Sequence, residues 1–88
     1  MKVEFRESFA KDLRGVKAKG LLGRVREVID AAEKADSLAE MSNLKKLKGG
    51  GKYFRVKVGD YCIGITLENN TIVFVRVLNR KDIYKHLP

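Results

Sequence analysis

Side chains able to act on a phosphate group occur in two short stretches of the second half of the chain. Arg55 and Lys57 alternate along a run with strand character, so their side chains lie on one face, about 7 Å apart. That spacing suits adjacent oxygens of a phosphodiester backbone. Arg80, Tyr84 and His86 bring a guanidinium, a phenol and an imidazole together near the carboxyl end. Such a group can bind a phosphate, stack on a base and move protons.

Each of these groups also has a purely structural explanation. Exposed basic residues on a strand commonly keep a protein soluble or protect the edge of a sheet, and Arg55 and Lys57 fit that role. Tyr84 can dock on the core from a frayed end, and His86 lies where chain termini are commonly disordered. Residue types and spacing alone leave both explanations open.

The distribution of charge favours a site for a polyanion. Ten Lys and Arg stand against three acids between Lys45 and Pro88, whereas nine stand against eight between Met1 and Leu44. The basic half is the half that contains the candidate side chains. Positive charge concentrated on strands and on the segment after them is typical of a surface that holds nucleic acid.

Length and composition limit the class of protein. Residues 1–88 are expected to form a single small domain, which buries roughly 60 to 65% of the surface that its unfolded chain exposes. No apolar run approaches the ~20 residues of a membrane span. One cysteine, Cys62, and one histidine predict neither a disulfide nor a metal site, and no cofactor is expected. The start of the chain has no apolar signal segment, which predicts a cytoplasmic location.

Hydrophobic periodicity predicts the elements that position the candidate residues. Alternation over residues 2–6 predicts a strand, and Ser8 stands where a helix N-cap is expected. Apolar residues at helical spacing then predict two helices, one from Phe9 that ends near Gly15 to Gly20 and one from Leu21 to Ala32, which form an antiparallel hairpin. The segment 36–52 is rich in Ser, Asn, Lys and Gly and is predicted to be a basic loop.

Three further strands are predicted, and two-residue turns at Gly59-Asp60 and Asn69-Asn70 set their register. The first turn pairs Lys57 with Cys62, and the second pairs Cys62 with Val77. The predicted fold class is α+β, with two layers in the order β-α-α-β-β-β. Its sheet is mainly antiparallel, with the helical hairpin on one face and an open basic face on the other.

The open face is expected to combine basic side chains with an apolar floor. Alternation places Val73, Val75 and Val77 on the same face as Arg55 and Lys57. Exposed apolar residues of this kind need cover. We therefore expect an acidic, partly disordered partner that folds when it binds this face.

Two other side chains in this region are expected to have structural roles. Arg76 falls on the helix-facing side opposite Ile63, where it reaches the end of the sheet or pairs with a helix carboxylate. Cys62 lies beside Lys57, which can lower the pKa of a thiol, but no histidine or acid is placed to complete a nucleophile. Cys62 is expected to be a small, half-buried filler.

Two stretches, Leu47 to Tyr61 and Val75 to Tyr84, resemble the RelE/ParE toxins of bacterial and archaeal toxin–antitoxin systems. The likeness covers essentially the whole chain, including Phe9 to Leu13 after the first strand. The RelE branch consists of endoribonucleases that cut messenger RNA in the ribosomal A site, without metal, by attack of the ribose 2′-hydroxyl on the adjacent phosphate. The resemblance implies that activity here, with mRNA, the ribosome and an acidic cognate antitoxin as partners. The ParE branch poisons DNA gyrase without those catalytic residues, so a gyrase toxin stays as an alternative.

The resemblance also implies roles for individual residues. By position, Arg55 and Lys57 match the two basic strand residues of the RelE branch. Arg80 matches its arginine after the last strand, and Tyr84 its carboxy-terminal tyrosine. Arg55 and Arg80 are then expected to hold the scissile phosphate and Lys57 to act as general base or electrostatic stabiliser. Tyr84 is expected to orient the nucleotide by stacking or proton transfer. Further candidates are the substrate contacts Lys48, Lys52 and Lys81, and also His86.

One position departs from the family pattern. RelE-branch members usually carry arginine directly after the Gly-Asp-Tyr turn, where this chain has Cys62. That arginine is expected to stabilise the pentacovalent phosphate, and loss of one preorganised cation lowers a rate on the order of a hundredfold. Three outcomes follow: a weakened nuclease, a nuclease in which Arg55 compensates, or a toxin fold that only binds antitoxin or nucleic acid.

Overall fold

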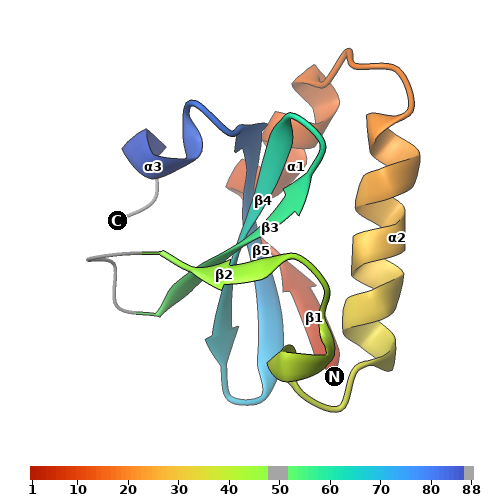
Figure 1. Cartoon of the computed structure of the whole chain (residues 1–88), viewed down its shortest axis with the longest axis vertical. Coiled ribbons are helices and arrows are strands. Elements are labelled where there is room, and N and C mark those ends of the chain that lie inside the picture. Colours follow the sequence, from red (N-terminus) through yellow and green to blue (C-terminus); the bar gives the residue numbers. More distant parts are fainter. Residues whose placement is uncertain (48–51, 87–88) are drawn as a thin grey trace.

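The computed structural model describes residues 1–47 and 52–86. Its centre is a five-stranded sheet in the order β1-β5-β4-β3-β2 (Figure 1). β1 runs parallel to β5 and the other neighbours are antiparallel, which confirms the predicted, mainly antiparallel α+β fold. Among the described residues, no helix is long and apolar enough to cross a membrane. The elements are β1 (Lys2–Phe5), α1 (Glu7–Gly15), α2 (Leu21–Lys34), the 3-10 helix η1 (Leu38–Glu40), β2 (Leu44–Lys46), β3 (Tyr53–Val58), β4 (Tyr61–Glu68), β5 (Thr71–Asn79) and α3 (Ile83–His86).

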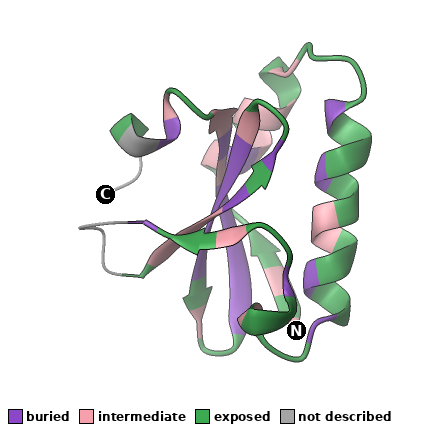
Figure 2. Cartoon of the chain, in the orientation of Figure 1, coloured by how far each residue is buried: buried purple, intermediate pink, exposed green. Residues whose placement is uncertain are grey.

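Two helices cover one face of the sheet because each presents an apolar stripe. α1 packs on β5, and α2 packs on β1 and β3. Phe9 anchors the stripe of α1, while Leu21, Val25 and Ala32 anchor that of α2. These side chains join Phe74 and other sheet residues in the main core. Figure 2 shows buried residues along the central strands and along the side of α2 that faces them.

The two predicted hairpin turns are confirmed. Gly59, Asn69 and Asn70 adopt φ values of 60°, 51° and 59°, the left-handed conformations that tight two-residue turns require. A Cβ added to Gly59 would come within 2.8 Å of Nη1 of Arg24. The first turn therefore needs glycine for its backbone, whereas the flexible end of the Arg24 side chain could move aside. The β3–β4 register follows the prediction.

The register of β5 departs from the prediction at a β-bulge. Ile65 pairs with Phe74 as predicted, but Gly64 pairs with Arg76, which leaves Val75 as an extra residue in β5. A bulge shifts every later pair by one residue, and a shift of one residue exchanges the two faces of a strand. The predicted faces are therefore correct before the bulge, and those of Val77 and Leu78 are reversed after it.

The bulge changes the residue that pairs with Cys62. Its predicted pairing with Val77 is wrong, because Cys62 pairs with Leu78. Val77 pairs with Ile63 and belongs to the main core, while Leu78 packs with the cluster around Cys62. For the same reason Arg76 does not lie opposite Ile63.

Side chains of α1 support the bulge. The Oγ of Ser8 donates a 2.6 Å hydrogen bond to the carbonyl of Val75. Ser8 is the second residue of α1, so its predicted role as N-cap is wrong. Asp12 accepts hydrogen bonds from Nε and Nη2 of Arg76, at 2.7 and 3.0 Å, and from the N–H of Val77 at 3.0 Å. The predicted pairing of Arg76 with a helix carboxylate is confirmed.

Replacement of Asp12 with alanine is expected to lower the free energy of unfolding by about 1–3 kcal/mol, because a guanidinium and a backbone N–H lose their acceptor. Denaturation by urea measures the change. Asp30 is an exposed carboxylate on α2, and Asp30→Ala is the matched control, expected to have little effect. Similar losses for both variants would contradict the role assigned to Asp12.

The segment predicted as a loop contains regular structure. Leu44–Lys46 forms the edge strand β2, antiparallel to β3, after the short helix η1. The prediction is wrong here because three residues are too few to show a period, and the strand is defined by its pairing with β3. The sheet thus has a fifth strand at its edge, which widens the basic face.

The apolar floor of this face is covered by the chain itself. Leu47, Cys62, Val73, Val75 and Ile83 form a second buried cluster, with Leu47 just after β2 and Ile83 in α3. The expectation that Val73 and Val75 need cover from a partner is wrong, since they are 3% and 7% exposed. Basic side chains remain exposed beside this covered floor.

Candidate functional site

Three cations from two separate segments converge on one hollow. A space of about 130 Å³ is lined by Arg55 and Lys57 of β3, Cys62 of β4 and Arg80, which follows β5. The sheet register places Lys57 directly opposite Cys62. Arg80 is tied to the β3–β4 turn, because its N–H donates a 2.9 Å hydrogen bond to the carbonyl of Asp60. The structure thus brings together the three residues expected to surround a phosphate.

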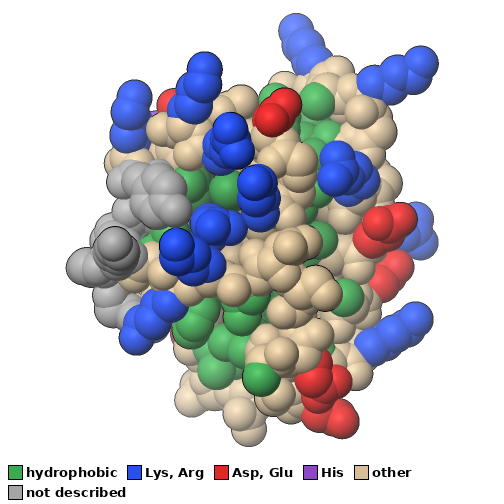
Figure 3. All heavy atoms as spheres, in the orientation of Figure 1, with side chains coloured by type: hydrophobic (Ala, Val, Ile, Leu, Met, Phe, Trp, Pro, Cys, Tyr) green, Lys and Arg blue, Asp and Glu red, His purple; other side chains and the backbone are tan. Residues whose placement is uncertain are grey.

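The three cations of this hollow have no carboxylate partner among the described residues. In the part of the chain that the structure describes, the ion pairs are Arg6 and Lys52 with Glu68, and Arg76 with Asp12. Figure 3 shows Lys and Arg gathered on the face that carries β2 and β3, with acids mainly toward α2. Like charges held close together favour the binding of an anion. Across residues 1–47 and 52–86, no three His, Cys, Asp or Glu side chains gather as they would to hold a metal ion.

Cys62 lines the hollow as part of the second buried cluster and is 2% exposed. Burial raises the pKa of its thiol above the ordinary value, against the opposite effect of Arg55, Lys57 and Arg80. Desolvation thus outweighs three nearby positive charges, and the thiol stays protonated at neutral pH. Cys62 acts as a filler, more deeply buried than the sequence suggests.

Cys62 is expected to make the fold less stable at alkaline pH. The unfolded thiol ionises near pH 8.5, and the folded thiol ionises at a higher pH. Its contribution to stability is therefore complete below the unfolded pKa and is lost as the pH rises through the folded pKa. Chemical denaturation between about pH 7 and pH 10 should show a smaller loss of stability for Cys62→Ala than for the unaltered chain. Equal losses would contradict the effect of burial.

Two of the lysines predicted as substrate contacts, Lys52 and Lys81, are not among the residues that line the hollow. Lys52 precedes β3 and its Nζ lies 3.6 Å from a carboxylate oxygen of Glu68. Lys81 is exposed in the turn before α3, where its N–H donates to Oδ1 of Asn79 at 3.0 Å. Lys48 lies outside the described residues. Lys52 and Lys81 are thus peripheral to the three cations.

Tyr84 and His86 both belong to α3, which begins three residues after Arg80. Ile83 fixes the start of this helix in the second buried cluster. The N–H of Asp82 donates to the carbonyl of Asn79 at 2.8 Å, which closes the turn between β5 and α3. The packing of Ile83 therefore holds α3 beside the segment that supplies Arg80.

Lys45 is a further basic residue of this face that sequence periodicity does not reveal. β2 pairs it directly with Arg55, so the two side chains lie on the same face. A second hollow, of about 280 Å³, is lined by Asn43, Leu44, Lys45, Arg55 and Lys57. The Leu44–Lys46 strand gives too short a signal to place Lys45 from sequence.

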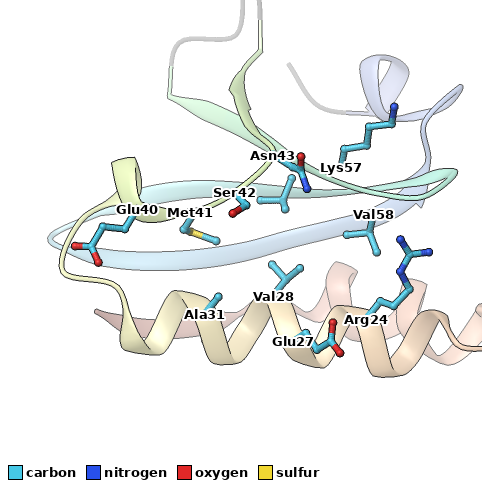
Figure 4. A pocket seen from close by; sticks show the side chains of 11 residues that line it. Arg24, Glu27, Val28, Ala31, Glu40, Met41, Ser42, Asn43, Lys57 and Val58 are labelled. Carbon is cyan, nitrogen blue, oxygen red and sulfur yellow. The ribbon is translucent and has the colours of Figure 1, made fainter.

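A different groove, of about 360 Å³, lies between α2 and the segment that leads into β2 (Figure 4). Val28 and Val58 line it, together with charges of both signs such as Arg24 and Glu27. In Figure 4, Val58 points toward α2, whereas Lys57 points away from it. The groove therefore lacks charge of a single sign, and the hollow of the three cations is the better anion site.

Comparison with known proteins identifies the family of this chain. A family model described as the ParE toxin of the type II toxin–antitoxin system parDE matches residues 3–84. The chain is also 40% identical to Toxin RelE3 of Methanocaldococcus jannaschii over 89 residues, which cover 100% of both proteins. The chain belongs to the RelE/ParE family of toxins. It is a toxin of the type II toxin–antitoxin class, as the resemblance of its two basic stretches predicted.

Solved structures of RelE/ParE toxins share the fold. The RelB-RelE antitoxin-toxin complex from Methanococcus jannaschii contains a chain with 39% identity and a TM-score of 0.80, with 97% of this chain and 99% of that chain covered. An archaeal RelE-RelB complex from Pyrococcus horikoshii OT3 gives 23% identity and a TM-score of 0.70, with 90% and 93% covered. The second likeness concerns the fold alone.

Proposed function

We propose that this RelE/ParE family member is an endoribonuclease that cleaves messenger RNA in the ribosomal A site and thereby inhibits translation in the cytoplasm. The observation that supports the proposal is the hollow lined by Arg55, Lys57 and Arg80, which come from two distant parts of the chain. Cations held around a space of this size, with no carboxylate partner in residues 1–47 and 52–86, suit a phosphodiester group. The similarity to Toxin RelE3 adds support.

The proposed reaction takes its nucleophile from the substrate. The ribose 2′-hydroxyl attacks the adjacent phosphorus, and the bond from phosphorus to the 5′-oxygen of the next nucleotide breaks. A 2′,3′-cyclic phosphate and a free 5′-hydroxyl result. Because RNA supplies the nucleophile, the protein needs only cations around the phosphate and a group that moves a proton. Activation of a water molecule by a metal ion is not required in this scheme.

Each residue of the site has its own proposed role in this reaction. Arg55 and Arg80 hold the non-bridging phosphate oxygens from two sides of the hollow. Lys57 takes the proton of the 2′-hydroxyl or stabilises the charge that develops on the phosphate. Tyr84, in α3, orients the nucleotide by stacking or gives a proton to the leaving oxygen. Lys52 and Lys81 make peripheral contacts with the RNA, and Lys48 and His86 are further proposed contacts.

The rate of RNA cleavage to be expected depends on the presence of Cys62 in place of the family arginine. The arginine that usually stands at this position would add a fourth cation, but Arg55, Lys57 and Arg80 already line the hollow. We propose that Arg55 compensates and that the chain cleaves RNA as it stands. Cleavage by Cys62→Arg alone, with none by the unaltered chain, would instead indicate a toxin fold that has lost its chemistry and retained binding.

An acidic antitoxin is the proposed protein partner. The chain has a net charge of +8 at pH 7, and similar toxins have been crystallised with RelB. Since Leu47 and Ile83 already cover the apolar floor, charge complementarity on the basic face is expected to contribute strongly to this association. Binding of the antitoxin should therefore weaken as the salt concentration rises.

The rival function is inhibition of DNA gyrase. It is kept because the matching family model is that of a ParE toxin and because Cys62 departs from the RelE pattern. The purified chain should be added to ribosomes paused on a defined mRNA and, separately, to a gyrase supercoiling reaction. Cleaved mRNA with unchanged supercoiling supports the nuclease. Intact mRNA with inhibited supercoiling supports the rival.

A further inference from the structure

We propose that Lys45 forms a second phosphate subsite, which holds the phosphodiester next to the scissile one in a bound RNA strand. The inference rests on the proposed function, because a second subsite would allow the same basic face to hold one more nucleotide of the RNA. It begins from the edge strand β2, which places Lys45 opposite Arg55.

The two hollows of this face share two of their lining residues. Arg55 and Lys57 line the hollow that also contains Arg80, and they line the second hollow together with Lys45. Residues directly opposite on neighbouring antiparallel strands have their Cβ atoms about 5 Å apart. The four basic side chains therefore form one track across β3, from the end of β5 to β2.

The surroundings of Lys45 favour an anion. Its hollow is lined by the amide residue Asn43 and by Leu44, and no carboxylate is among the described residues that line it. The carbonyl of Asn43 accepts the N–H of Lys57 at 3.3 Å, which holds the start of β2 against β3. The structure thus fixes the position of the backbone that carries Lys45.

A nucleic acid strand is the occupant that this arrangement fits. Such a strand presents one negative charge per nucleotide at regular intervals, and it meets two successive cationic hollows that share Arg55 and Lys57. The second hollow, at about 280 Å³, is larger than the first, at about 130 Å³. It has room for a sugar beside the phosphate.

Lys46 provides a matched control within the same strand. It carries the same charge and is also exposed, but it pairs with Phe54 and so lies on the opposite face from Lys45. Protection of the sheet edge or general solubility would involve both lysines alike. A phosphate subsite involves only Lys45.

The test uses two short RNAs whose 2′-oxygens are methylated and which therefore cannot be cleaved. One is a dinucleotide with a single phosphodiester, and the other is a trinucleotide with two. NMR titration measures their affinities at several salt concentrations. For the trinucleotide, Lys45→Gln should make the slope of log K against log salt shallower by about 0.7, the value for one single-strand phosphate contact. Affinity near 50 mM salt should fall about five- to tenfold.

The same experiment contains its controls. The dinucleotide should bind Lys45→Gln as it binds the unaltered chain, and both Lys45→Arg and Lys46→Gln should bind the trinucleotide normally. Equal effects of Lys45→Gln and Lys46→Gln, or equal losses for both RNAs, would overturn the subsite. If Arg80→Ala still weakens both RNAs in that case, the proposed function stands. No binding of either RNA by the unaltered chain would overturn the subsite, while cleavage on programmed ribosomes would still test the proposed function.

Discussion

Replacement of Arg80 with alanine is expected to lower the rate of mRNA cleavage about a hundredfold, the loss typical of one preorganised cation at a developing negative charge. Arg80 lines the hollow with Arg55 and Lys57. Its own backbone N–H bonds to the carbonyl of Asp60, and alanine retains that bond. The variant should therefore lose the guanidinium while it keeps the path of the chain into α3.

Single-turnover cleavage on ribosomes programmed with a defined mRNA measures this effect. Arg26 is an exposed arginine on α2, so Arg26→Ala removes the same charge at a distance from the hollow. Its cleavage rate should stay close to that of the unaltered chain. Equal rates for Arg26→Ala and Arg80→Ala would remove Arg80 from the proposed mechanism.

Replacement of Phe74 with alanine is expected to cost about 3–5 kcal/mol of the free energy of unfolding. Phe74 is 0% exposed in the main core. Its ring centroid lies 5.3 Å from that of Phe5 and 5.4 Å from that of Phe9. A domain of this kind has only about 5–15 kcal/mol of stability in total, so the variant is expected to be near the limit of folding.

Phe5 is the natural comparison, because it belongs to the same aromatic cluster but is 50% exposed. Phe5→Ala should cost less than half as much as Phe74→Ala, since half of its surface already contacts water. Urea denaturation of both variants gives the two values. A cost at Phe5 equal to that at Phe74 would contradict the placement of the core around β5.

Local signals in the sequence predicted the half of the sheet that carries Arg55 and Lys57. Glycine and asparagine at the two turns favour left-handed backbone, and Gly59, Asn69 and Asn70 adopt it. Since a two-residue turn sets the pairing of its strands, the face of Arg55 and Lys57 could be predicted without any knowledge of tertiary contacts.

Features that depend on distant contacts could not be predicted in this way. The bulge at Val75 is supported by Ser8 and Asp12 of α1, which lie more than 60 residues away in the sequence. Alternation carries no sign of such a contact, so the faces of Val77 and Leu78 were predicted in reverse. Resemblance to the family, rather than periodicity, indicated the role of Arg80.

The boundaries of the basic face were hidden for a similar reason. A strand of three residues has no period, so β2 and the position of Lys45 depend on the pairing with β3. The burial of Cys62 depends on Leu47 and Ile83, which approach it from segments on either side of the hairpins. The face that carries Arg55 and Lys57 could therefore be predicted from the sequence. The positions of Lys45 and of the buried cluster around Cys62 follow only from the folded structure.

The most direct test of the proposed function is primer extension on mRNA from cells that briefly express this chain. Cells that express the double variant Arg80→Ala, Tyr84→Phe serve as the comparison. The proposed nuclease predicts new 5′ ends confined to translated regions, and it predicts their loss in the double variant. Intact mRNA in cells whose growth is nevertheless arrested would contradict the nuclease and support action on gyrase.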